Sequence, residues 1–159
     1  MRRRLIQTEV DFLQRYFGTA LDTSSIRLAA ARGRRAYAIH GNHIWLPRQD
    51  FMSRDTTASV NLLELSAATF AHEATHVWQR QRGLWVTLKG AVLQLGNQCG
   101  IDPYAYDRWE SDPTTLLSHF LTGNIEQQGQ IVQDLVFCDL TGQTVAKFCE
   151  VHAYLLSSL

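Results

Sequence analysis

Residues 72–76 read His-Glu-Ala-Thr-His, an H-E-x-x-H motif that carries the strongest chemical signal in the chain. In a helix, residues four positions apart lie one turn apart on the same face. His72 and His76 can therefore both direct an imidazole nitrogen at one metal ion. Glu73 lies beside them, close enough to act as a general base on water at that metal. This arrangement is typical of zinc peptidases and predicts Zn²⁺ as the cofactor.

A catalytic zinc site usually has three protein ligands and one open position, so a third ligand must come from elsewhere in the chain. A helix is expected from Asn124, which is a good N-cap, to Cys138. Glu126 lies in its first turn and follows His76 by 50 positions, enough for this helix to cross the motif helix. We predict Glu126 as the third ligand. The alternative is an exposed carboxylate that the helix dipole favours at a helix start.

Two blocks of sequence resemble a known family. Residues 70–79 read Phe-Ala-His-Glu-Ala-Thr-His-Val-Trp-Gln, and residues 124–128 read Asn-Ile-Glu-Gln-Gln. They resemble metallopeptidase-like proteins associated with bacterial contractile injection machines. These include VgrG-related proteins, the peptidase extension of some type VI secretion spikes, and the core domain of extracellular contractile injection systems. The resemblance covers most of residues 10–138.

The resemblance implies a zinc-binding, gluzincin-like fold with His72, His76 and Glu126 as ligands and Glu73 as the base. It also implies two kinds of partner, namely a protein or peptide substrate and a VgrG spike or other secretion component. The protein would be made in the cytoplasm and exported by a contractile injection system.

Other residues are candidates for supporting roles. In thermolysin an Asp four residues after the Glu ligand supports a ligand histidine, whereas this chain has Gln130 at that spacing and its next acid at Asp134. Either is a candidate to support a ligand by a hydrogen bond. Peptide hydrolysis also needs a group that stabilises the oxyanion or contacts the substrate. The candidates are Tyr104, Tyr106 and His119.

The remaining sequence predicts a single zincin-like domain over residues 1–159, of α+β class and mostly helical, with a small antiparallel hairpin or sheet beside the motif helix. Asn61 and Glu64 have the spacing of a capping box, and Gly83 is a natural stop, so the motif helix is expected between them. A hairpin is expected around Gly41-Asn42, and its edge could bind an extended peptide as an added strand.

The other expected elements follow from apolar spacing and turn residues. Residues 84–95 are expected to form a buried helix because Leu84, Leu88, Val92 and Leu95 recur at helical spacing, and residues 96–122 are expected to be irregular. The further expected elements are a helix over 8–17, a strand over 26–30, hairpin strands over 36–40 and 43–46, a polar loop over 48–59, and a last helix ending near 156.

Composition sets modest bounds on function. The net charge is zero, so charge gives no argument for nucleic-acid binding. Basic clusters at residues 2–4 and 32–35 are interpreted as a frayed terminus and a solvated face. Three cysteines, an odd number, favour buried free thiols over a disulfide framework. No signal peptide and no transmembrane segment are apparent.

Two classes of function remain open. The first is a zinc metallopeptidase associated with a type VI-like secretion system, as an effector or an accessory enzyme. The second is a catalytically silent, zincin-shaped adaptor that binds a secretion component. The intact Glu73 favours the enzyme, because a purely structural zinc site does not need an acid beside its first histidine. The sequence does not specify the substrate.

Overall fold

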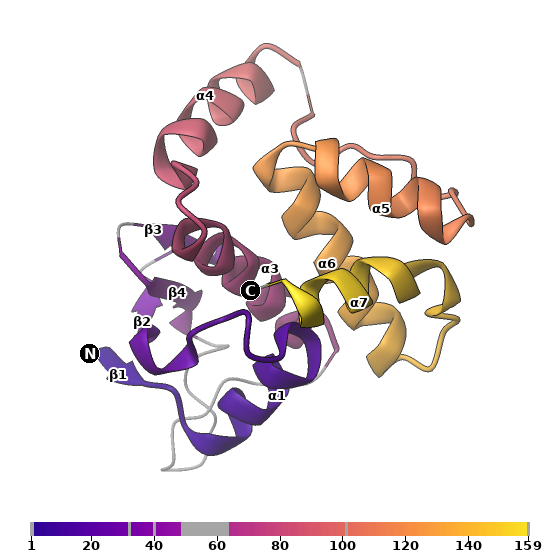
Figure 1. The fold of residues 1–159 in the computed structure, drawn as a ribbon. Helices are drawn as coiled ribbons and strands as arrows, with labels where there is room; N and C mark the ends of the chain where they lie inside the picture. Colours follow the sequence, from indigo (N-terminus) through magenta and orange to yellow (C-terminus); the bar gives the residue numbers. More distant parts are fainter. Residues whose placement is uncertain (1, 32, 40, 49–63, 101, 159) are drawn as a thin grey trace.

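The computed structural model describes residues 2–31, 33–39, 41–48, 64–100 and 102–158. Over these residues the chain is α+β and mostly helical, as the sequence predicts (Figure 1). The strands are β1 (Arg2–Arg4), β2 (Arg27–Ala31), β3 (Tyr37–Ile39) and β4 (His43–Pro47). The α-helices are α1 (Gln7–Phe17), α3 (Glu64–Gln81), α4 (Val86–Gln98), α5 (Pro113–Thr122), α6 (Ile125–Leu140) and α7 (Cys149–Ser157). Two 3₁₀ turns, η1 (Thr23–Ser25) and η2 (Ala146–Phe148), complete the described elements.

The four strands form one sheet in the order β1-β2-β4-β3. β3 and β4 pair antiparallel, with Tyr37 opposite Trp45, which confirms the predicted hairpin. Gly41 lies in their connection with φ of 67°, a conformation that favours glycine. The prediction of an antiparallel sheet is wrong for the sheet as a whole, because β2 and β4 pair in parallel. This mixed pairing arises because the hairpin places β3 at the edge and returns β4 alongside β2.

The basic N-terminus is a strand and not the frayed end that the sequence suggests. β1 pairs antiparallel with β2. Arg3 donates to both carboxylate oxygens of Glu9, at 2.6 and 2.8 Å, and Glu9 is fully buried on α1. A buried carboxylate is costly without a partner, so this ion pair fixes the start of the chain against α1.

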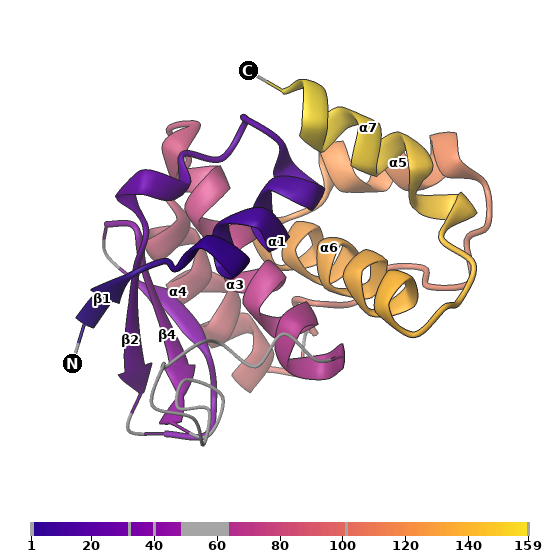
Figure 2. The ribbon, with the colours of Figure 1, turned by 90° about the horizontal axis from the view of Figure 1, so that it is seen from below.

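Helix α3, which carries the H-E-x-x-H motif, lies between the sheet and α6 (Figure 2). Its core is built from Phe70 and Val77 with several alanines, all fully buried. Small side chains allow neighbouring elements to approach a helix closely. The described part of α3 ends before Gly83, which has φ of 82° as expected for the stop, whereas the predicted capping box at Asn61 lies outside the described residues.

Two expectations about residues 84–122 are wrong. The region expected to be irregular contains α5, which Asp112 caps by accepting a hydrogen bond from the Thr115 amide, with Pro113 at the first helical position. The helix expected from 84 to 95 forms as α4, but it is not buried. Leu88 is 59% exposed and Val92 is 61% exposed. Helical spacing shows which residues share a face, but it does not show whether the same chain covers that face.

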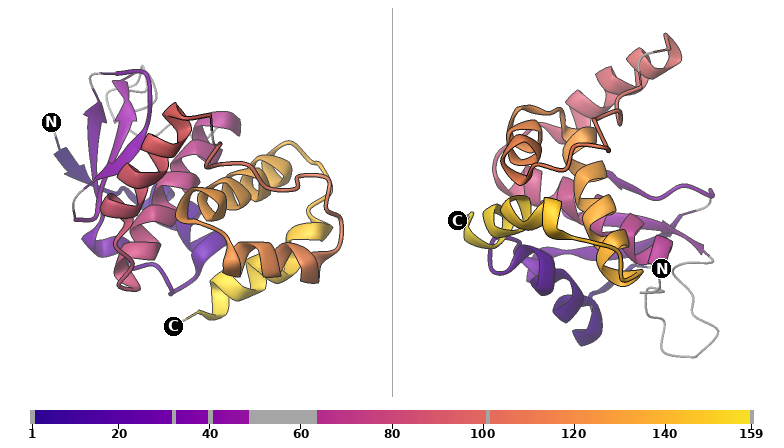
Figure 3. Two further views of the ribbon diagram at one scale, coloured as in Figure 1. Left: turned by 90° about the horizontal axis from the view of Figure 1, so that it is seen from above. Right: turned by 90° about the vertical axis from the view of Figure 1, so that its right-hand side faces the viewer.

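Figure 3 shows α4 extending away from the rest of the molecule.

Among the described helices, none combines the length and apolarity needed to cross a bilayer. The cysteines are free, as predicted, but Cys99 and Cys149 are exposed and not buried.

Candidate metal centre

Two helices bring the predicted ligands together. The α3 register places His72 and His76 one turn apart, and α6 presents Glu126 from its first turn; all three side chains are buried. Asn124 fixes this end of α6, because its side-chain oxygen accepts hydrogen bonds from the amides of Glu126 and Gln127. The Glu126 carboxylate, the candidate third ligand, therefore has a defined position and is buried, not exposed.

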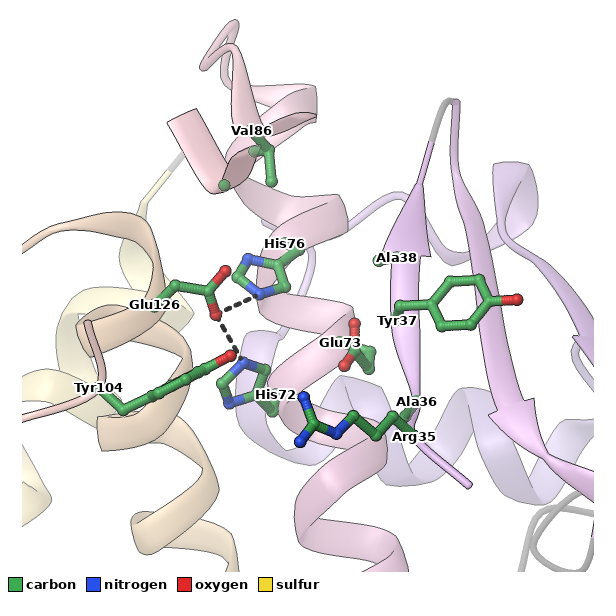
Figure 4. A pocket seen from close by; sticks show the side chains of 11 residues that line it. Arg35, Ala36, Tyr37, Ala38, His72, Glu73, His76, Val86, Tyr104 and Glu126 are labelled. Carbon is green, nitrogen blue, oxygen red and sulfur yellow. Dashed lines mark ion pairs between the residues drawn. The ribbon is translucent and has the colours of Figure 1, made fainter. Parts of the chain in front are cut away.

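The distances from Glu126 to the two histidines suit a tetrahedral metal site (Figure 4). Oε2 of Glu126 lies 3.4 Å from Nε2 of His72 and 3.3 Å from Nε2 of His76. Bonds of about 2.0–2.1 Å in a tetrahedron place neighbouring ligand atoms about 3.3–3.4 Å apart. The same separations lie at the long end of the range for N–H···O hydrogen bonds. The three side chains are therefore spaced so that they could hold Zn²⁺, and long hydrogen bonds join them when no metal is bound.

The charges of the cluster also fit a divalent cation. Glu73 and Glu126 are two buried carboxylates in one site, and a Zn²⁺ ion bound by neutral imidazoles would balance both. In the absence of metal, burial alone would raise the pKa of Glu126, but hydrogen bonds from His72 and His76 outweigh it and lower that pKa to about 2. Burial would likewise lower the pKa of His76, but its hydrogen bond to Glu126 and the charge of Glu73 raise it. Protons and metal therefore compete for the same nitrogens.

Glu73 faces the same cleft as the ligands. The cleft has a volume of about 380 Å³ and is bounded by the β3 segment, α3, α4 and the N-terminal end of α6. Oε2 of Glu73 is buried and has no hydrogen-bond partner among the described residues. Burial raises the pKa of Glu73, while attraction to His76 and His72 offsets part of that rise. A carboxylate with an unused oxygen in a cleft of this kind can accept a proton from water.

Gln79 orients His76, a candidate ligand, and no local sequence pattern points to this role. Gln79 is fully buried, and its Oε1 lies 2.9 Å from Nδ1 of His76. Its Nε2 donates to the Ile125 carbonyl and to Oε1 of Gln128 on α6. Because the amide nitrogen is used in this way, Oε1 must face His76 and accept its Nδ1–H. The lone pair of His76 is then on Nε2, which points toward Glu126.

We expect Gln79→Leu to lower zinc affinity by roughly 10- to 100-fold, the range found when outer hydrogen bonds to metal ligands are lost. Competition with a chelator of known affinity measures the change. Gln79→Glu is the matched control, because it retains an acceptor for His76, and it should hold zinc more tightly than Gln79→Leu. A folded Gln79→Leu variant with unchanged zinc affinity would contradict the role.

Gly129 allows α6 to pass beside His72. A Cβ atom at this position would lie 2.9 Å from both Cε1 and Nε2 of the His72 ring. Nδ1 of His72 is buried without a hydrogen-bond partner among the residues described, so on that side the ring is positioned by packing alone.

Gly129→Ala should therefore displace the His72 ring and lower zinc affinity about 10-fold or more, while the helix itself gains up to about 1 kcal/mol in propensity. Gly90→Ala is the control, because a Cβ there would lie 3.7 Å from Oε1 of Glu126, an ordinary contact. Zinc titration and far-UV circular dichroism of the two variants test this. Equal zinc affinity in both would show that the close approach at Gly129 is unimportant.

The segment that carries Tyr104 is attached to α6. The Asn124 side chain donates to the carbonyl of Pro103, and the Gln127 side chain donates to the carbonyl of Ala105. Tyr104 lies between these two points, lines the cleft, and has its ring centroid 6.1 Å from that of His72. Figure 4 shows its hydroxyl directed toward His72 and Glu126. Of the candidates for oxyanion or substrate contact, Tyr104 is the one at the cleft.

The other candidate residues lie elsewhere. Tyr106 donates from its hydroxyl to Oδ2 of Asp134 at 2.6 Å, and Gln130 donates to Oδ1 of the same carboxylate at 2.8 Å. Asp134, held by Gln130, therefore anchors the Tyr104 segment through Tyr106, and among the described residues neither of the pair makes a hydrogen bond to His72 or His76. His119 lies on α5 and does not line the cleft. Arg35, at the start of the β3 segment, does line it, although only its charge was noted from the sequence.

Comparisons with known proteins give a consistent relationship. No family model matches the chain. The type VI secretion system spike protein VgrG2b of Pseudomonas aeruginosa is 32% identical in an alignment 137 residues long, which covers 83% of this chain but only 13% of the length of that protein. The solved structure of the effector domain of P. aeruginosa VgrG2b superimposes with a TM-score of 0.70 and 28% identity, covering 93% of this chain and 80% of that domain. The chain is homologous to that effector domain, which confirms the expected VgrG relationship.

Proposed function

We propose that this homologue of a spike-protein effector domain is a zinc-dependent peptidase that acts as a type VI secretion effector. The observation that carries the proposal is the buried ligand set of His72, His76 and Glu126, with the free oxygen of Glu73 in the same cleft. Three ligands and an adjacent acid are the requirements of a catalytic zinc site of the gluzincin kind. A structural zinc site that only linked α3 to α6 would not need Glu73 in the cleft.

The residues divide the chemistry between them. Bound at His72, His76 and Glu126, Zn²⁺ would supply a Lewis acid that makes water more acidic and polarises a peptide carbonyl. Oε2 of Glu73 would take the proton from that water and pass it to the leaving amine nitrogen. The Tyr104 hydroxyl would donate a hydrogen bond to the developing oxyanion. Tyr104 is kept at the cleft by the hydrogen bonds that Pro103 and Ala105 accept from α6 and its cap.

Strand β3 supplies a binding edge for the substrate. It is the last strand of the sheet, so its outer backbone edge is unpaired among the described strands, and residues 36–38 line the cleft. The Arg80 guanidinium donates to the carbonyl of Ala38 at 3.1 Å and holds β3 against α3. An extended polypeptide can pair with such an edge and place one of its peptide bonds beside the metal ligands.

The role in secretion is tested in a recipient bacterium. The protein is expressed in the cytoplasm and, with an added export signal, in the periplasm, because the site does not specify where the substrate lies. We expect the wild-type protein to reduce survival in one compartment and Glu73→Gln to be harmless there at equal expression. Equal effects of both proteins, or none in either compartment, would contradict the enzyme and favour an adaptor that binds a secretion component.

A further inference from the structure

Helix α4 carries apolar side chains that no described element covers. Val86 and Gly90 line the metal cleft, whereas Leu88 is 59% exposed and Trp85, just before the helix, is 74% exposed. Large apolar side chains grouped on a surface generally mark a binding site. Their position beside the metal cleft suggests what binds there.

A second hollow adjoins the cleft along α4. It has a volume of about 440 Å³, and its lining residues are Arg80, Leu84, Trp85, Val86, Leu88 and Ala91. We call it the α4 hollow. Val86 lines both the cleft and the α4 hollow, so the two hollows adjoin at this residue. Apart from Arg80, every lining residue is apolar.

We propose that the α4 hollow is a specificity subsite that receives a bulky apolar side chain of the polypeptide substrate. This inference rests on the proposed function, because it assumes that a polypeptide lies along the cleft. The hollow is large enough to hold a bulky side chain, and it meets the cleft at Val86, so a polypeptide that lies along the cleft can reach it.

The geometry also places the subsite along the substrate. β3 and α3 run in the same direction past the cleft (Figure 4). Ala36, at the start of the β3 segment, lies near Glu73 of α3, whereas the carbonyl of Ala38, two residues later, accepts a hydrogen bond from Arg80, seven residues later in α3. Antiparallel pairing is slightly more stable than parallel pairing, so a substrate strand added antiparallel to β3 would have its N-terminal side toward Arg80. Arg80 lies six residues beyond the midpoint of the two histidines, which is about 9 Å along a helix. At about 3.3 Å per extended residue, the hollow would take the side chain two or three residues before the scissile bond.

Cleavage-site mapping tests the subsite. The zinc-loaded protein is incubated with denatured proteins, and the products are sequenced by mass spectrometry. We expect Leu, Ile, Phe and Met to be enriched two or three residues before the cut. Leu88→Ser should remove this enrichment and lower kcat/KM for the best peptide about 10-fold or more, in the range that apolar pockets contribute to specificity. Val92→Ser is the matched control, because Val92 is equally exposed on α4 but lines a separate hollow toward α6, and this change should alter kcat/KM less than about twofold.

A binding measurement separates this inference from the proposed function. Zinc-loaded Glu73→Gln is titrated by calorimetry with a Leu-containing peptide and its Ser-substituted counterpart, and then Leu88→Ser is introduced into the same protein. We expect about 10-fold weaker binding of the Ser peptide and a loss of that difference with Leu88→Ser. If the Glu73→Gln protein binds the peptides in this way but the wild-type protein cleaves nothing, the subsite is supported and the peptidase proposal is contradicted. If the wild-type protein cleaves without an apolar preference, the subsite alone is overturned. The absence of both binding and cleavage would overturn both proposals.

Sedimentation of the wild-type protein completes the test. A concentration-dependent dimer that Leu88→Ser dissociates would assign the α4 surface to a second copy of the chain and overturn the subsite. A monomer whose sedimentation is unchanged by Leu88→Ser is the expected result.

Discussion

Replacement of Glu73 by Gln is expected to lower peptide hydrolysis by a factor of about 10²–10⁴, the usual contribution of general acid–base catalysis. The amide has the same shape but cannot accept a proton at Oε2. Zinc content and fold should be retained, because Glu73 is not among the clustered ligands and no hydrogen bond to its Oε2 is lost. The thermal midpoint should stay the same or rise, since burial disfavours the charged carboxylate. Hydrolysis of a denatured protein and a thermal scan with excess zinc measure the two effects.

The control for this variant is Glu150→Gln, which removes an acid from the first turn of α7, outside the cleft, and should leave activity unchanged. If Glu73→Gln unfolds, then Glu73 is a structural residue and the enzymatic proposal fails. Full activity in a folded Glu73→Gln variant would show that another group takes the proton.

Removal of a ligand should have the largest effect on zinc binding. We expect His72→Ala and Glu126→Ala each to weaken zinc affinity by more than the roughly 10- to 100-fold caused by loss of an outer hydrogen bond. Free zinc at about 1,000 times the dissociation constant would stabilise the wild-type protein by about 4 kcal/mol, and both variants should lose most of this stabilisation. Chelator competition and thermal scans with and without zinc measure both quantities.

His119→Ala is the matched control, because it removes a histidine from α5 that lies outside the cleft. Its zinc affinity should equal that of the wild-type protein. A Glu126→Ala variant that still holds zinc at wild-type affinity would exclude Glu126 as a ligand, although His72 and His76 could still bind.

Much of the site could be predicted because its signals are local. The spacing of His72 and His76 defines a shared helical face within one turn, and Asn124 with Gln127 defines the start of α6 within four residues. Turn chemistry at Gly41-Asn42 similarly defined the hairpin. Each of these features depends on residues within a few positions of one another. Helix periodicity, capping and turn geometry can therefore be recognised in the sequence itself.

The features that were missed depend on residues far apart in the chain. Gln79 orients His76 only because α6 supplies acceptors for its amide, and Gly129 is needed only because His72 packs against it. The pairing of β1 with β2 likewise joins distant residues, since Arg3 lies opposite Leu28. The exposure of Leu88 could not be predicted, because an apolar helical face looks the same whether the same chain or a substrate covers it.

The zinc K-edge X-ray absorption spectrum of the purified protein tests the central claim most directly. The account predicts about one zinc per chain, with two imidazole nitrogens at about 2.0–2.1 Å, further ligation by oxygen, and no sulfur neighbour. A protein that retains no zinc from a zinc-supplemented buffer would contradict it. So would a sulfur neighbour at about 2.3 Å, which would assign the metal to the free cysteines and not to His72, His76 and Glu126.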